Sequence, residues 1–183
     1  IKPVLGIEAY FSDDRRLKEK IKQTDAFGDI SGSDKRYYHL TLFAENNDGY
    51  RNLIKLSSDA FMNGMFYKPR MDWSTISKHS SGVICTSGCL GGPVLQKLLF
   101  DDYDGALAAA ARLQDIFGRE NFFMELMNHG LPEQKKTNPQ LVEIGNKLGA
   151  PLVATQDTHY VHAKDCDTHD VLLCCQTGAE RSN

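Results

Sequence analysis

The sequence lacks the features that mark membrane, secreted and strongly basic proteins. Its 183 residues contain no apolar run long enough to cross a membrane, and no succession of basic, apolar and small residues marks a secretory signal. The net charge is −3 at pH 7, which argues against a broad basic face that holds duplex nucleic acid. We therefore expect a cytoplasmic protein without a membrane anchor, in which any contact with nucleic acid depends on local groups.

Cysteine is scarce and irregularly spaced. The five cysteines, an odd number, fit buried thiols and one metal ligand in a reducing compartment better than a disulfide framework. We predict no disulfide. With 41% hydrophobic and 25% charged residues, the chain has the composition of one compact domain with a sizeable core.

Apolar runs and helical periodicities alternate along the chain. Strands are predicted at 4–10, 38–44, 82–86, 121–126 and 151–155, the first and last of them buried. Helices are predicted at 49–62, 73–79, 94–100, 101–117, 139–148 and 163–175, and a Pro-containing connection at 65–70. Asn138 is predicted to cap the fifth helix, with Pro139 at its first position. Strand then helix, repeated five times, predicts right-handed crossovers, a parallel sheet and an α/β fold.

Residues 12–35 interrupt this alternation. They are rich in charge and end in a glycine- and serine-rich stretch, with too little apolar surface to offset the entropy of ordering. We predict a mobile insertion whose loss affects stability little. The chain also opens on Ile1-Lys2-Pro3-Val4-Leu5, as though already inside an element, and we expect it to be a piece of a longer protein.

Polar side chains lie at or near the ends of successive predicted strands. They are Glu8, His39, Cys89, Glu125 followed by His129, and Asp157 with His159. The last two are two residues apart, so an extended backbone points both to the same side. In barrels, active-site residues come from the C-terminal ends of several strands. Carboxylates, imidazoles and a thiol at one end of an α/β fold predict a centre for zinc, manganese or iron rather than calcium.

Each of these residues also has an interpretation without a metal. Glu8 could cap a turn, and His39 could be a core histidine whose hydrogen bonds are satisfied. Cys89 lies near glycines and could be there for its small size, and Glu125 could begin a solvated loop. The Asp-x-His pair could be a turn aspartate beside a surface histidine. Ligand spacing across separate strands cannot be tested from the sequence.

Longer motifs extend over almost the whole chain. They are Gly6-Ile7-Glu8-Ala9-Tyr10, His39-Leu40-Thr41-Leu42, Asn46-Asn47-Asp48-Gly49-Tyr50-Arg51-Asn52-Leu53, Ser87-Gly88-Cys89-Leu90-Gly91-Gly92, Glu125-Leu126, His129-Gly130-Leu131-Pro132-Glu133-Gln134, Ala154-Thr155-Gln156-Asp157-Thr158-His159-Tyr160 and His169-Asp170-Val171-Leu172-Leu173. In this order they resemble the polymerase and histidinol phosphatase (PHP) domain of the bacterial DNA polymerase III alpha subunit.

The resemblance implies an incomplete, distorted seven-stranded (β/α) barrel of PHP type with a di- or trinuclear metal site. It implies metal ligands at Glu8, His39, Cys89, Asp157 and His159, and second-tier catalytic residues at Glu125 and His129. It assigns residues 1–175 to the domain and 176–183 to the start of a linker to the polymerase palm. The family's first two strands, with a His-x-His motif and further ligands, would precede Ile1, so we expect an N-terminally truncated domain with an incomplete cluster.

The resemblance also implies a function: a metal-dependent 3′-5′ exonuclease or phosphoesterase module of a DNA-replicating polymerase, a nucleotidyltransferase, with the fragment inactive alone. One alternative is a non-catalytic scaffold that stabilises the polymerase and docks the proofreading subunit. Another is a free-standing PHP phosphoesterase that acts on a small phosphate ester. The implied partners are the rest of the alpha subunit, DNA and a proofreading exonuclease subunit. An uncovered sheet edge would make the fragment self-associate.

Overall fold

The structure is a computed structural model that describes residues 2–18 and 37–181. Its strands are β1 (Gly6–Phe11), β2 (Tyr38–Ala44), β3 (Met65–Phe66), β4 (Lys68–Met71), β5 (Val83–Thr86), β6 (Phe122–Leu126) and β7 (Leu152–Ala154). Its helices are α1 (Asn47–Asn63), α2 (Trp73–Lys78), α3 (Pro93–Leu99), α4 (Tyr103–Phe117), α5 (Pro132–Leu148), the 3-10 helix η1 (Ala163–Asp165) and α6 (Cys166–Thr177).

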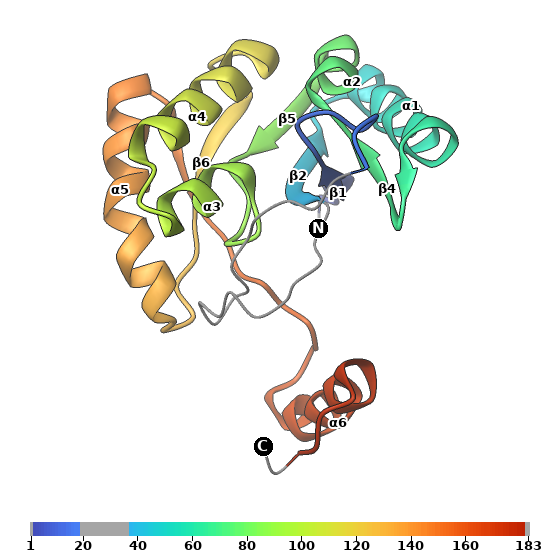
Figure 1. Ribbon diagram of the computed structural model, residues 1–183, viewed down its shortest axis with the longest axis vertical. Coiled ribbons are helices and arrows are strands. Elements are labelled where there is room, and N and C mark those ends of the chain that lie inside the picture. Colours follow the sequence, from blue (N-terminus) through green and yellow to red (C-terminus); the bar gives the residue numbers. More distant parts are fainter. Residues whose placement is uncertain (1, 19–36, 182–183) are drawn as a thin grey trace.

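The strands form one mixed sheet in the order β3-β4-β1-β2-β5-β6-β7 (Figure 1). The pairs β1–β4, β5–β6 and β6–β7 are parallel, whereas β2 is antiparallel to both β1 and β5. The α/β class is confirmed, but the prediction of a parallel sheet is wrong around β2. That prediction treated each strand and helix as one crossover unit. After α1 the chain instead forms β3 and β4, in the segment that was predicted as a connection. β4 then pairs with β1.

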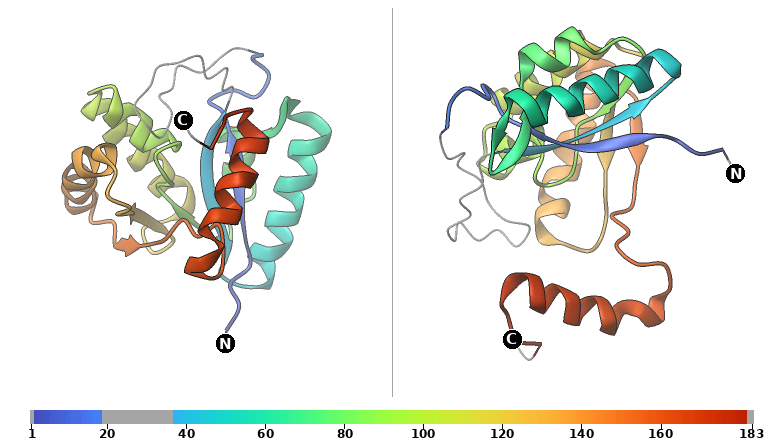
Figure 2. Two further views of the ribbon diagram at one scale, coloured as in Figure 1. Left: turned by 90° about the horizontal axis from the view of Figure 1, so that it is seen from below. Right: turned by 90° about the vertical axis from the view of Figure 1, so that its right-hand side faces the viewer.

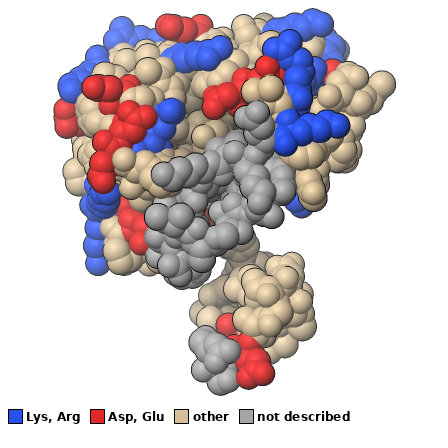
Figure 3. Space-filling view, in the orientation of Figure 1, with Lys and Arg blue, Asp and Glu red and all other residues tan. Residues whose placement is uncertain are grey.

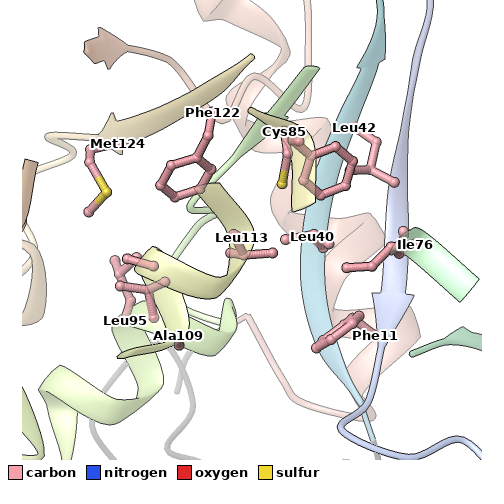
Figure 4. Packing of buried hydrophobic residues seen from close by; sticks show 14 of the residues in the cluster. Phe11, Leu40, Leu42, Ile76, Cys85, Leu95, Ala109, Leu113, Phe122 and Met124 are labelled. Carbon is pink, nitrogen blue, oxygen red and sulfur yellow. The ribbon is translucent and has the colours of Figure 1, made fainter. Parts of the chain in front are cut away.

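The sheet and its helices share one hydrophobic core (Figure 4). Alternate residues of β1 and β2 point into it, namely Ala9, Phe11, Leu40 and Leu42, all 4% exposed or less. The helices contribute Leu56 from α1, Ile76 from α2 and Leu113 from α4. This packing leaves the intervening residues of β1 and β2 on the opposite face of the sheet.

Two strands that were predicted to be buried are partly uncovered. The first begins at Gly6, and the preceding Val4 and Leu5 are 64% and 53% exposed. β7 lies at one end of the strand order, next to β6, and its Leu152 is 44% exposed. Among the described residues β3 and β7 lie at opposite ends of the order, so the sheet is open, consistent with a partial barrel. Apolar composition indicated the strands but not which neighbours cover them.

The start of α2 agrees with the helix predicted at 73–79. The Asp72 side chain caps it by accepting from the Thr75 N–H at 3.0 Å. α5 begins at Pro132, so the predicted start at Asn138 is wrong. The Asn138 amide donates to the Met127 carbonyl at 2.9 Å instead of capping a helix. None of the helices in residues 2–18 and 37–181 combines the length and apolarity that crossing a membrane requires.

The described start of the predicted insertion, residues 12–18, is attached to the rest of the fold. Ser12 is buried, and its N–H donates to the Met71 carbonyl at 2.9 Å. The buried guanidinium of Arg70 donates to the Arg15 carbonyl at 2.6 Å. The mobility of this segment stays a prediction. The remainder of the predicted insertion lies outside the described residues.

The last helix, α6, lies apart from the helices that pack on the sheet (Figures 1 and 2). The prediction of helical structure at 163–175 is confirmed by η1 and α6. No residue of α6 is buried, and Val171, Leu172 and Leu173 are 48%, 54% and 42% exposed. Within the described part of the chain, α6 therefore presents an apolar surface that no other element covers.

Candidate metal centre

Strands β1 and β2 bring Glu8 and His39 together on the face of the sheet opposite the core. The antiparallel register pairs Tyr10 with His39, and Glu8 precedes Tyr10 by two residues on the same face. His39 Nδ1 lies 2.8 Å from Glu8 Oε1. A proton on Nδ1 would be donated to this carboxylate.

Cys89 reaches the same point from the turn between β5 and α3. The turn contains Gly88 at φ 82°, a conformation that favours glycine. The His39 N–H donates to the Gly91 carbonyl at 2.9 Å, which fastens the turn to the start of β2. The Cys89 Sγ consequently lies 3.9 Å from His39 Nδ1.

One ligand atom each of Glu8, His39 and Cys89 lies within 4.8 Å of the other two. Ligands that share one ion at bond lengths of about 2.0 to 2.3 Å are roughly 3 to 4 Å apart, so the group is close to binding distance. A carboxylate, an imidazole and a thiol are donors that suit zinc. Three protein ligands beside an open position are also the arrangement of catalytic zinc sites. The residues present therefore fit a divalent ion.

The thiol of Cys89 lies in a negative environment. Burial raises its pKa, and the charges of Glu8, Asp157 and Glu125 raise it further, against the opposing effect of the Gly91 N–H. Positive charge reverses this balance, because a cation stabilises a thiolate. The carboxylates around Cys89 therefore provide a potential that favours binding of a divalent cation.

Asp157 and His159 follow β7 and pair with each other. His159 Nε2 lies 3.1 Å from Asp157 Oδ1, and the two side chains are 59% and 60% exposed. Neither belongs to the three-residue group defined above. Asp157 is near enough for its charge to act on the Cys89 thiol. The role of Asp157 and His159 as metal ligands stays a prediction.

Glu125 is buried at the end of β6 and is held by hydroxyl groups from both sides. Its Oε2 accepts from Thr86 Oγ1 at 2.5 Å, and its Oε1 accepts from Thr155 Oγ1 at 2.6 Å. Its N–H donates to Ser87 Oγ at 2.9 Å. Glu125 therefore connects the ends of β5, β6 and β7 and contributes negative charge, while both its oxygens are already bonded.

His129 is oriented by Gln134 in the first turn of α5. The His129 N–H donates to Gln134 Oε1 at 2.7 Å, and the Gln134 amide nitrogen lies 2.9 Å from His129 Nδ1. The Asp157 N–H donates to His129 Nε2 at 3.3 Å. This contact joins the loops that follow β6 and β7.

Three supporting residues escaped the sequence analysis: Thr86, Thr155 and Gln134. The two threonines flank Glu125 only because β5 and β7 are the neighbours of β6, and this order cannot be read from the sequence. Gln134 follows His129 by five residues, at the start of a helix that was predicted to begin later. A prediction that α5 begins at Pro132 would have placed Gln134 in its first turn, next to the loop that contains His129.

A cavity of about 610 Å³ lies away from the candidate ligands. It is lined by Asp13, Asp14, Arg15, Arg16, Asn63, Asp72, Trp73, Ser74, Ser77, Arg112 and Ile116. Its arginines and aspartates include the ion pair between Arg16 and Asp14. The cavity therefore has mixed charge and shares no residue with the candidate metal centre.

Comparison with known proteins identifies relatives along the whole chain. The family model described as "PHP domain" matches residues 1–129. DNA polymerase III subunit alpha of Saccharopolyspora erythraea is 44% identical over 189 residues, which cover 97% of this chain and 16% of that protein. The subunit of Thermus aquaticus is 42% identical over 177 residues, which cover 97% of this chain and 14% of that protein. The subunit of Borreliella burgdorferi is 38% identical over 183 residues, which cover 100% of this chain and 15% of that protein. The chain spans about one seventh of the length of these relatives.

Proposed function

The chain belongs to the PHP domain family, and from this premise we propose that it is a metal-dependent phosphodiesterase domain of a cytoplasmic DNA polymerase III alpha subunit. Its substrate would be the 3′ end of single-stranded DNA. The observation that carries the proposal is the convergence of Glu8, His39 and Cys89 from three separate segments. Residues so distant in sequence have no common structural task that requires a carboxylate, an imidazole and a thiol at one point.

We assign the ion to Glu8, His39 and Cys89, with Asp157 and His159 as further ligands from the loop after β7. Zinc, manganese and iron suit these donors. When bound, such an ion supplies Lewis acidity toward phosphoryl oxygens and activates water for attack on phosphorus. His39 would give up the proton that it shares with Glu8. Cys89 would become a thiolate once a cation offsets the neighbouring carboxylates.

Glu125 and His129 support the centre in this proposal. The negative charge of Glu125 acts on Cys89 from beneath the turn, while its own oxygens stay bonded to threonine hydroxyls. His129 Nε2 accepts from the Asp157 N–H, so His129 holds the loop that carries Asp157 and His159. Neither role requires direct contact with the ion. Within the group Glu8 is exposed, whereas His39 and Cys89 are partly buried.

A second candidate function is that of a non-catalytic scaffold in the polymerase. The observation that favours it is the apolar surface of α6, with Val171, Leu172 and Leu173 about half exposed. A longer alpha subunit would supply the partner that covers this surface, either its own palm or a proofreading subunit. The two functions are compatible, because α6 and the three-residue group are separate parts of the chain.

Hydrolysis by the complete natural protein tests the catalytic proposal. A 5′-labelled single-stranded oligonucleotide is incubated with zinc or manganese, and products shortened from the 3′ end are measured beside nucleotide incorporation. Cys89→Ser and Asp157→Asn are expected to lower the hydrolysis rate at least about a hundredfold, because each removes a ligand, while incorporation persists. Cys175→Ser, an exposed cysteine on α6, serves as the matched control and keeps both activities. Full hydrolysis by the two ligand variants would favour the scaffold instead.

A further inference from the structure

An aromatic group lies directly beside the candidate metal centre. Tyr10 is paired with His39 in the β1–β2 register and faces the same side of the sheet. The rings of Tyr10 and Tyr37 meet edge to face at 4.6 Å between centroids, and the ring of Tyr37 is stacked with that of His39 at 5.8 Å. Both tyrosines are half-buried. The His39 imidazole and the two tyrosine rings therefore form one aromatic cluster.

A lysine from the neighbouring hairpin completes this surface. Lys68 begins β4, and its Nζ lies 5.3 Å from the centroid of the Tyr10 ring. Lys68 is exposed and forms no ion pair with the residues that the structure describes. Tyr67, at the tip of the β3–β4 hairpin, is 71% exposed and adopts φ 63°, which is uncommon outside glycine. We call Tyr10, Tyr37 and Lys68 the stacking surface, and Tyr67 precedes Lys68 in the chain.

We infer that the stacking surface binds the bases of single-stranded DNA whose terminal phosphodiester lies at Glu8, His39 and Cys89. Aromatic rings with a nearby cation are the means by which proteins hold single strands without reading their sequence, because every base has a flat π face. A base in duplex DNA is enclosed by its neighbours and cannot stack on a protein ring. The inference rests on the proposed function and deepens it, since it assigns the residues that would select an unpaired strand.

Charge explains why a local surface is needed. The chain has a net charge of −3, and on the face shown in Figure 3 lysine and arginine are interspersed with aspartate and glutamate. Such a surface holds DNA weakly through its backbone charge alone. Stacking contributes affinity that does not depend on net charge. Lys68 then needs to offset only the phosphates nearest to the bound bases.

Photocrosslinking tests the inference without requiring hydrolysis. A single-stranded oligothymidylate with 5-iododeoxyuridine at its last two 3′ positions is irradiated with the complete natural protein in the presence of a chelator, and the crosslinked peptides are identified by mass spectrometry. The expected crosslinks lie on Tyr10 or Tyr37. Tyr10→Leu together with Tyr37→Leu lowers the yield at these peptides at least about tenfold, as the loss of stacking on two rings implies. Tyr10→Phe keeps the ring and retains the yield.

Control variants and substrates make the result specific. Tyr50→Leu removes an exposed ring from α1 and is expected to leave the yield unchanged. A blunt duplex of matched length gives at least about tenfold less crosslinking at the same peptides. Crosslinks confined to other parts of the protein, or equal yields with the leucine variants, would overturn the inference. Crosslinking at Tyr10 without any hydrolysis would support the stacking surface and contradict the proposed function, whereas hydrolysis without these crosslinks would do the reverse.

Discussion

The bond between Thr86 and Glu125 shows how single residues support the candidate site. Glu125 is buried, and each of its carboxylate oxygens accepts one threonine hydroxyl. Thr86→Val keeps the shape of the side chain but leaves Oε2 without that partner. We expect the free energy of unfolding to fall by about 1 to 3 kcal/mol, the cost of leaving a buried polar group unsatisfied. Urea denaturation of both proteins measures this difference.

The control for this prediction is Thr158→Val, in the exposed loop after β7. It makes the same chemical change without a buried acceptor and should alter the free energy of unfolding by less than about 0.5 kcal/mol. Equal effects of the two substitutions would mean that the bond to Glu125 adds nothing to stability. In that case the buried carboxylate would have to draw its stabilisation from Thr155 alone.

At the residue scale, the sequence predicted part of the site. Glu8, His39 and Cys89 were each expected near strand ends, and the structure brings these three together. The threonines around Glu125 were not predicted, because their position depends on which strands are neighbours. Tyr10 is likewise an ordinary strand residue in the sequence, and its place beside His39 follows only from the β1–β2 register.

The start of α2 carries a prediction about a single element and its pH dependence. The Asp72 carboxylate accepts from the Thr75 N–H at 3.0 Å and from Ser74 Oγ at 2.7 Å. Burial alone would raise the pKa of Asp72, but these hydrogen bonds outweigh it and lower the pKa below 3.8. We expect Asp72→Ala to lower the free energy of unfolding by about 1 to 2 kcal/mol at pH 7, as the loss of an N-cap does.

The sign of the pH effect follows from the lowered pKa. The folded protein keeps Asp72 ionised at a lower pH than the unfolded chain does, so the contribution of the charge is complete above about pH 4 and disappears as the pH falls through the folded-state pKa. The difference between wild type and Asp72→Ala should therefore shrink in acid, as thermal unfolding at pH 7 and pH 3 would reveal. Asp48→Ala, on the exposed first turn of α1, provides the control with little effect at either pH.

At the scale of elements, local signals decided which predictions succeeded. α2 and α4 have side-chain caps and were predicted close to their observed starts. α5 has no side-chain cap, and Pro139 lies inside it, so the sequence indicated a later start than the true one. β3 and β4 are only two and four residues long, with a proline in the second, and periodicity cannot detect such short strands.

For the whole molecule, the sequence predicted the class of fold but not its topology. The direction of β2 depends on long-range pairing with β1 and β5, and no periodic pattern records such pairing. Among the described residues, Leu152 of β7 and the apolar side chains of α6 are partly exposed. Self-association of the chain through these surfaces remains a prediction.

Anomalous diffraction at the zinc absorption edge tests the central claim, the metal centre, most directly. Crystals of the protein grown with zinc are expected to show an anomalous peak about 2.0 to 2.3 Å from ligand atoms of Glu8, His39 and Cys89. The same data would reveal whether Asp157 and His159 join the ion. Cys89→Ser crystals should show a weaker peak, because the thiolate is lost. A peak bound elsewhere on the chain, with the Glu8, His39 and Cys89 side chains still bonded only to one another, would contradict the account.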